Sequence, residues 1–203
     1  MASSVDISNL ALGAIGDPAT VSKIDPPEGS VHAEKCSKWY PIARDALLER
    51  FPWSFAKRRA ALAEVLNPLN NWLYAYALPN DCVRPRAVLE ETASDESAAQ
   101  PFDVETDASG VKVLYTNVQN AQLLYTRRVT DATKFTPLFT LALVELLAAY
   151  LAGPVLKGTT GVKMREAKLR DFMAVYLDAT ASDAGARMSD ARETHLPPWM
   201  ANR

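Results

Sequence analysis

Few side chains in this sequence could combine into a catalytic or metal-binding centre. The chain has two histidines, and His32 lies four residues before Cys36, a spacing that puts both on one face of a helix. Zinc sites usually need three or four ligands, and no second pair accompanies this one. We therefore interpret His32 as part of a helix surface, His195 as a solvated side chain in a polar stretch, and Cys36 and Cys82 as buried free thiols.

A run of acidic residues in the middle of the chain could in principle gather a divalent cation. Residues 90–107 contain no lysine or arginine, but the acids lack the loop spacing of an EF-hand. A solvated acidic loop and hairpin is the preferred interpretation, because charge runs are usually exposed. The acidic residues are Glu90, Glu91, Asp95, Glu96, Asp103, Glu105 and Asp107.

Motifs that support common enzyme classes are missing from the sequence. It contains no GxxxxGK[ST], GxGxxG or GxSxG pattern, and no nucleophile and base stand at a recognisable spacing. We therefore expect a protein that is not an enzyme, with no catalytic residue, no metal and no cofactor.

Two short basic clusters invite a nucleic-acid hypothesis. They are Lys57, Arg58 and Arg59, and then Arg127 and Arg128. No aromatic platform accompanies them, and a net charge of −2 with a pI near 5.7 provides no global basic field. A solvated or ion-paired face is the simplest interpretation. The functional interpretation that we prefer is contact with an acidic patch on a neighbouring subunit.

The N-terminal third has the apolar periodicity of helices. A short helix is predicted before Gly16, with Ser3 or Ser4 as its N-cap. A second helix is predicted from near Ser30 to just before Pro52, and a third over residues 53–66. The first helix should bury a face made of Ile7, Leu10, Ala11, Ala14 and Ile15. The N-terminus lacks the basic region and apolar run of a secretory signal, so we expect synthesis and assembly in the cytoplasm.

The C-terminal third also predicts helices. Thr136 and Pro137 form a good helix start, and the helix over residues 138–152 carries only one charge, Glu145. Its fifteen residues fall short of the roughly 20 that span a bilayer, so we expect a central core helix that ends at residues 153–154. An amphipathic helix over residues 161–181 should pack on it.

Between these helices the pattern changes to the alternation of strands. Strands are predicted at residues 72–78, 86–90, 102–106, 111–115 and 123–129, with a hairpin turn at 107–110.

These elements predict a mainly α fold with an inserted β-rich part. Residues 1–185 would form a single domain, with a helical body at 1–70 and 131–185, a small antiparallel sheet or hairpin within the insertion at 71–130, and an extended C-terminal docking tail at 186–203. The tail is too proline-rich and too short to form its own core. Its candidate interface residues are Pro197, Pro198, Trp199 and Arg203.

Four segments resemble the tail tubular protein A family of short-tailed phages. They occur in the family's order and cover most of the chain up to residue 179, whereas residues 90–110 depart from the family. The segments are NLALGAIGD at 9–17, WYPIARDALLERFPWSFAKRRAALA at 39–63, WLYAYALPNDCVRPRAV at 72–88 and LLYTRRVTDATKFTPLFTLALVELLAAYLA at 123–152. Trp199 and Arg203 look like the family's aromatic and basic end.

The resemblance implies a virion structural protein of the tail or neck. Its members are head-to-tail adaptors that form a ring, commonly a dodecamer, between the portal protein and the tail nozzle protein. Genomic DNA would pass through the channel of the ring without sequence-specific binding. No membrane partner is implied, and assembly would take place in the bacterial host cytoplasm.

Two alternatives stay open at this point. Within virions, the chain could be a head-completion or tail-terminator protein at a different ring. From another class, it could be a small DNA-binding regulator, which would need a recognition helix such as residues 53–66 with the cluster Lys57, Arg58 and Arg59 on its surface.

Overall fold

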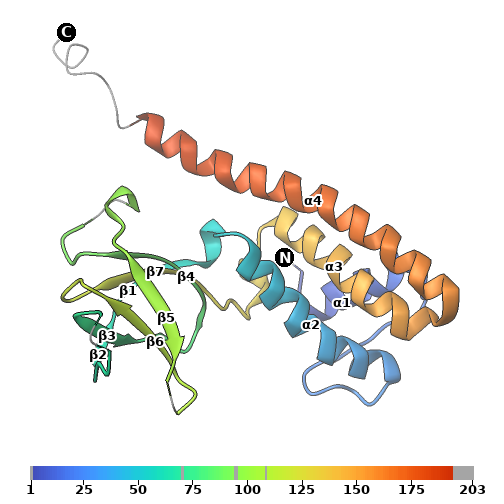
Figure 1. The fold of residues 1–203 in the computed structure, drawn as a ribbon. Helices are drawn as coiled ribbons and strands as arrows, with labels where there is room; N and C mark the ends of the chain where they lie inside the picture. The colour runs from blue at the N-terminus through green and yellow to red at the C-terminus, as the bar shows by residue number, and fades with distance from the viewer. Residues whose placement is uncertain (1, 70, 94–95, 108, 194–203) are drawn as a thin grey trace, which may run out of the picture. The chain divides into compact units, whose positions relative to one another are not determined.

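The computed structural model describes residues 2–69, 71–93, 96–107 and 109–193 (Figure 1). Contacts divide the chain into two compact units: a helical unit of Met1–Leu47 with Thr130–Arg203, and a β unit of Leu48–Val129. The chain is 49% helical and 22% strand. The fold is therefore mixed, with a helical part and antiparallel sheets. The predicted combination of helices and a sheet is confirmed, but the prediction of a mainly α fold overstates the share of helix.

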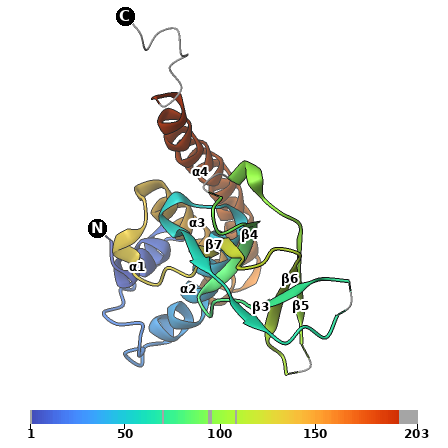
Figure 2. The ribbon, with the colours of Figure 1, turned by 90° about the vertical axis from the view of Figure 1, so that its left-hand side faces the viewer.

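The helical unit is built on a helical hairpin. Helix α3 is followed after one residue by the longer helix α4, which runs back along it (Figures 1 and 2). Helix α1 also packs on α3. The bounds are α1 Ser4–Ala14, α2 Val31–Arg50, α3 Pro137–Leu156 and α4 Gly158–Glu193.

Helix α1 begins and ends as the sequence predicts. The Ser3 hydroxyl accepts a hydrogen bond from the Asp6 amide at 3.1 Å, and the Asp6 carboxylate accepts one from the Ser3 amide at 2.8 Å, so two helix-end donors are satisfied. Gly16 follows at φ +80°, a left-handed conformation that ends the helix at low cost. The predicted buried face is wrong at Leu10, because this side chain is exposed.

Helix α3 starts at the predicted cap, where the Thr136 hydroxyl accepts a hydrogen bond from the Phe139 amide at 3.3 Å. It does not end at residues 153–154 but continues to Leu156, because a proline in the last turn removes a single backbone bond. The helix is therefore long and apolar enough to cross a membrane by length and composition, a test that soluble core helices also pass. Leu143, Leu147 and Leu151 are fully buried, which agrees with the predicted core helix.

The other helices of the unit share this core. Rings of Trp39 on α2 and Tyr150 on α3 lie 5.3 Å apart, and Phe172 of α4 is buried. Helix α4 extends to Glu193, so the first eight positions of the predicted tail are helical. A lone Gly185 costs only about 1 kcal/mol in a helix and did not end it.

The β unit contains two antiparallel sheets. The first has strand order β1-β7-β4 and the second has order β2-β3-β6-β5. The strands are β1 Lys57–Ala61, β2 Ala63–Val65, β3 Tyr74–Ala77, β4 Cys82–Leu89, β5 Phe102–Thr106, β6 Lys112–Thr116 and β7 Gln122–Arg127. Cys82 thus opens strand β4, and it is half-buried instead of buried as predicted.

The predicted helix at residues 53–66 is wrong. The segment forms a short 3-10 turn at Ser54–Ala56 and then β1 and β2. Strand β1 pairs with β7 in the register Arg58↔Tyr125, and β2 pairs with β3. Backbone pairing with distant strands thus overrides a local helical spacing, and the β-rich part starts before residue 71.

The two sheets form one core. The amide of Leu62, between β1 and β2, donates to the Ala121 carbonyl at 3.0 Å, and Val88 of β4 forms a bridge with Gln100 just before β5. A buried cluster includes Tyr76 and Leu114 from one sheet and Leu123 and Tyr125 from the other. The sheets therefore enclose a common apolar interior.

The predicted hairpin between β5 and β6 is confirmed. The Asp107 carboxylate accepts hydrogen bonds from the amides of Ser109 at 2.8 Å and Val111 at 2.9 Å, and Gly110 adopts φ +83°. The Ser109 hydroxyl also donates to this carboxylate and is the main cause that lowers the pKa of Asp107.

Candidate assembly surfaces

Strand pairing brings the two basic clusters of the sequence together. Lys57, the first residue of β1, lies opposite Thr126 near the end of β7, so the residues at 57–59 and 127–128 gather at one end of the first sheet. Strand β4 pairs with the other side of β7 and adds Arg84 and Arg86. We call this group the basic end: Lys57, Arg58, Arg59, Arg84, Arg86, Arg127 and Arg128.

The residues at 57–59 already have partners within the chain. Lys57 forms an ion pair with Glu96, and Arg58 Nη1 lies 3.1 Å from Asp81 Oδ2. Arg59 Nη1 donates to the Ala93 carbonyl at 3.0 Å. This agrees with the ion-paired face expected from the sequence. Exposed pairs of this kind contribute only about 0.2–1 kcal/mol, so a partner could replace them cheaply.

Asp81 organises the basic end. Its Oδ1 accepts a hydrogen bond from the Tyr125 hydroxyl at 2.9 Å, and its carbonyl accepts one from the Arg128 amide at 2.6 Å. Burial raises the pKa of Tyr125 to about 12, and the hydrogen bond to Asp81 acts in the same direction. The phenol therefore remains a donor at neutral pH and holds β7 to the turn that carries Asp81.

Arg84 and Arg86 have a structural task that sequence reasoning missed. Their Nη atoms donate to the Glu49 carbonyl at 3.3 and 3.1 Å, in the last turn of α2. Cations are favoured at a helix C-terminus, where backbone carbonyls lack partners. Their spacing of two residues along a strand was the available signal, because it places both on one face.

The acidic residues lie on other parts of the same unit. Asp103 and Glu105 are exposed on β5, which is an edge strand of the second sheet, and Glu90 follows β4. Strand β1, an edge of the first sheet, carries basic residues instead. Among the described residues no three His, Cys, Asp or Glu side chains lie together in a way that could hold a metal, and Asp95 falls outside them.

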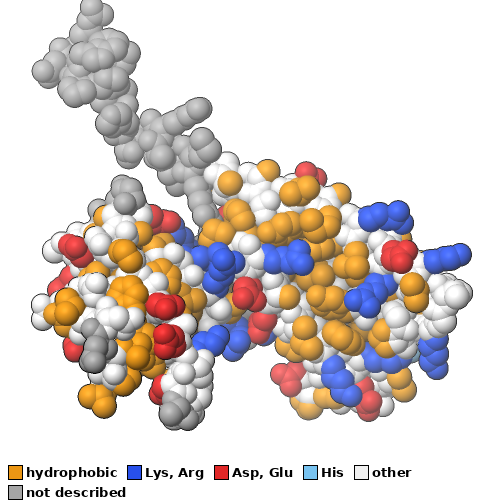
Figure 3. Space-filling model, in the orientation of Figure 1, with side chains coloured by type: hydrophobic (Ala, Val, Ile, Leu, Met, Phe, Trp, Pro, Cys, Tyr) orange, Lys and Arg blue, Asp and Glu red, His pale blue; other side chains and the backbone are white. Residues whose placement is uncertain are grey.

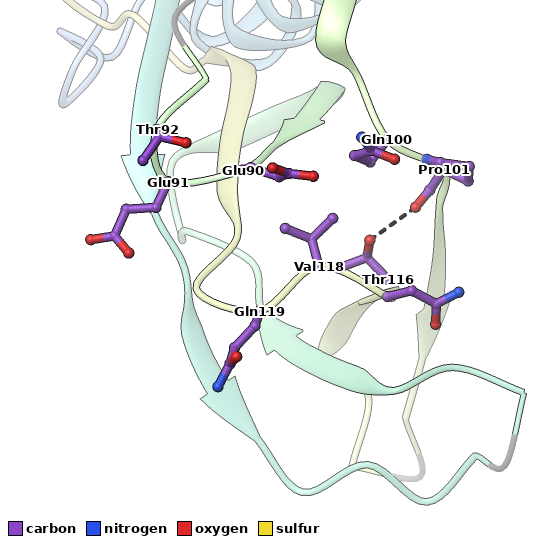
Figure 4. Close-up of a pocket in the computed structure, with 9 residues that line it drawn as sticks. Glu90, Glu91, Thr92, Gln100, Pro101, Thr116, Val118 and Gln119 are labelled. Carbon is purple, nitrogen blue, oxygen red and sulfur yellow. Dashed lines mark hydrogen bonds between the residues drawn. The ribbon is translucent and has the colours of Figure 1, made fainter.

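A pocket of about 610 Å³ lies beside the acidic loop (Figure 4). Glu90 points into it and Glu91 points away, while Thr116 donates to the Pro101 carbonyl at 2.9 Å across its wall. Its other side chains are neutral. Among the described residues, the charged side chains of the lining are the carboxylates Glu90 and Glu91.

The helical unit has an apolar surface of its own. Leu10 of α1 is 53% exposed and Leu141 of α3 is 51% exposed, and they flank a hollow of about 660 Å³. Gly13 adds no side chain to its floor, and a Cβ built there would meet no atom within 4 Å. We call this hollow the apolar groove: Leu10, Gly13, Ala14, Leu141 and Val144, with Asp6 and Asn9 at its rim. Further hydrophobic side chains gather over α3 and α4 on the face in Figure 3.

The remaining candidates for chemistry have ordinary roles. His32 Nε2 lies 3.0 Å from Asp17 Oδ2, and Cys36 is buried. Burial raises the pKa of Cys36, and it raises that of Cys82 to about 11. A raised pKa lowers the thiolate fraction of both cysteines at neutral pH, which disfavours their use as nucleophiles.

The tail residues Pro197, Pro198, Trp199 and Arg203 lie outside the described residues. Comparison with sequence models of protein families and with curated proteins gave no match.

Proposed function

We propose that this chain is a phage virion structural protein, a head-to-tail adaptor whose copies form a ring between the portal and the tail tube around the DNA channel. The observation that carries the proposal is the resemblance of four ordered segments to the tail tubular protein A family. These segments fall on α1, on α2 through β1, on β3 and β4, and on β7 through α3. They thus include elements of both units, whereas α4, β5 and β6 lie outside them.

The surfaces support an assembly role. Basic residues lie on edge strand β1 and acidic residues on edge strand β5, so one copy offers charges of opposite sign on different edges. Opposite patches on separate surfaces suit a head-to-tail contact between identical subunits. The apolar groove provides a second contact surface of the kind that marks interaction sites.

The test is imaging of the purified chain with the portal protein of the same phage. We expect added ring density on one end of the portal in negative-stain electron microscopy. Reversing Arg127 and Arg128 to glutamate should weaken this incorporation, whereas the same change at Arg165 and Arg170, which are exposed on α4, should not. A portal that stays bare with the unaltered chain would overturn the proposal.

Of the alternatives, the DNA-binding regulator loses its main support. Residues 57–59, which would have formed its recognition helix, lie in strand β1. Binding to short duplex DNA that falls steeply with salt would restore that alternative. Density at a ring other than the one next to the portal would favour a head-completion or tail-terminator protein.

A further inference from the structure

The apolar groove exposes two leucines that the described chain leaves open. Both lie on well-packed helices, since α1 packs against α3. Leu10 and Leu141 therefore cannot turn inward without disrupting buried neighbours such as Leu12 and Leu143. Exposed apolar surface held on rigid elements is suited to a complementary apolar segment.

The chain contains one apolar segment beyond its described part. Residues 196–200 read Leu-Pro-Pro-Trp-Met, and residues 194–203 carry no acid. Within the described part of the chain, Asp6 is the only charged residue that lines the groove, so the segment would meet no like charge from these residues. Two adjacent prolines also restrict the backbone, which reduces the entropy lost on docking. A tryptophan side chain buries roughly 150–250 Å² and is a common anchor at interfaces.

Geometry prevents this segment from reaching the groove of its own chain. Helices α3 and α4 form an antiparallel hairpin around Lys157, which places Leu141 level with about Met173. Glu193 lies twenty residues further along α4, a distance of about 30 Å at 1.5 Å per residue. Trp199 follows Glu193 by six residues, which span at most about 21 Å. The segment falls short even before the distance across α3 is added.

We propose that residues 196–200 of one copy dock in the apolar groove of a second copy, with Trp199 between Leu10 and Leu141. The contact is heterologous, because the segment and the groove are different surfaces, so repetition gives a ring or a filament. This inference rests on the proposed self-assembly and names the two surfaces that join.

A labelled peptide of residues 194–203 tests the groove directly. The receptor is the full chain with Trp199→Ala, whose own segment lacks the anchor. We expect saturable binding in fluorescence anisotropy, weakened at least tenfold by Leu141→Asp. The matched control is Leu177→Asp, a leucine 60% exposed on α4, which should leave binding unchanged. Equal binding by the Leu141 and Leu177 variants, or no saturable binding, would overturn the proposal.

Disulfide trapping distinguishes docking between copies from docking within one. One chain carries Leu10→Cys, and a second chain of different length carries Met200→Cys, so that their crosslinked product can be told apart on a gel. Both chains also carry Cys82→Ser, which removes the only half-buried native thiol among the described cysteines. We expect a covalent heterodimer after mild oxidation, and no such product when Leu177→Cys replaces Leu10→Cys. A single chain that carries both Leu10→Cys and Met200→Cys should also crosslink between copies. If it forms only a crosslink within one chain, docking between copies is refuted.

The outcomes separate this inference from the adaptor proposal. Peptide binding at the groove without any ring on the portal would keep the docking contact and reject the adaptor. Full ring formation on the portal by the Leu141→Asp chain would keep the adaptor proposal and reject the docking contact.

Discussion

The ion pair between Glu145 and Lys168 gives the sharpest test of the helical unit. Glu145 is the only charged residue within α3, its side chain is 21% exposed, and its Oε2 lies 3.1 Å from Lys168 Nζ on α4. We expect Lys168→Met to lower the free energy of unfolding by about 2–3 kcal/mol, because it leaves a largely buried carboxylate without its cation. The double variant Glu145→Leu, Lys168→Met should recover most of that loss.

The magnitude follows from two opposing effects. At 3.1 Å and an effective dielectric constant near 20, the attraction is about 5 kcal/mol, and desolvation of the two ions offsets several of these. The net value of the pair is therefore small, whereas removal of one partner exposes the full desolvation cost. Fully buried pairs lose about 3–5 kcal/mol in this way, and exposures of 21% and 15% place this pair below that range.

Urea denaturation followed by helical circular dichroism measures these differences. Lys168 also contacts Asp171 at 3.2 Å, but that carboxylate is exposed, so Asp171→Asn is the matched control and should cost under about 0.5 kcal/mol. Burial disfavours charged Lys168, yet hydrogen bonds from it to Glu145 and Asp171 prevail and raise its pKa above 10.5. The stabilisation should be complete below pH 10.5 and disappear as the pH rises through the raised pKa. A double variant as unstable as Lys168→Met would refute this account.

Three further changes test the fold. Thr136→Ala removes the N-cap of α3 and should cost about 1 kcal/mol in urea melts, whereas Thr140→Ala, one turn later, should cost less. Leu146→Asp buries a lone charge in α3 and should abolish the cooperative thermal transition; an unchanged melt would place that face at the surface. Hydrogen bonds to the ionised Asp107 carboxylate lower its pKa, so they stabilise the β5–β6 turn fully above about pH 3.8 and are lost as the pH falls through the lowered pKa. Amide signals of the hairpin should broaden first in that acidic range, and Asp107→Asn should remove this pH dependence.

The sequence predicted correctly those elements that depend on neighbouring residues along the chain. The start of α3 follows from a capping threonine and a proline, and the β5–β6 hairpin from alternation around a turn that contains Asp107 and Gly110. The end of α3 was predicted less accurately than its start. Pro154 falls in the last turn of the helix, where a proline destabilises the helix only slightly.

Strand β1 shows why the rest could not be predicted. Its alanines and basic residues have good helix propensity, and its strand conformation comes from pairing with β7, which lies more than sixty positions later. The basic end was hidden for the same reason, since the clusters at 57–59 and 127–128 meet only through that pairing. Exposed Leu10 was assigned to the core because periodicity cannot distinguish a buried leucine from one in a groove.

The two proposed contacts differ in their physical chemistry, and salt should separate them. A joint between the basic and acidic edge strands is electrostatic, and the Debye length falls from about 8 Å at physiological ionic strength to about 3 Å at 1 M. Docking of Trp199 in the apolar groove depends on buried apolar area, which salt does not screen. Copies in concentrated salt should therefore remain joined through the groove while the edge contact opens. Flexible chains of subunits would then replace closed rings, because a single contact fixes connectivity but two are needed to fix the angle between neighbours.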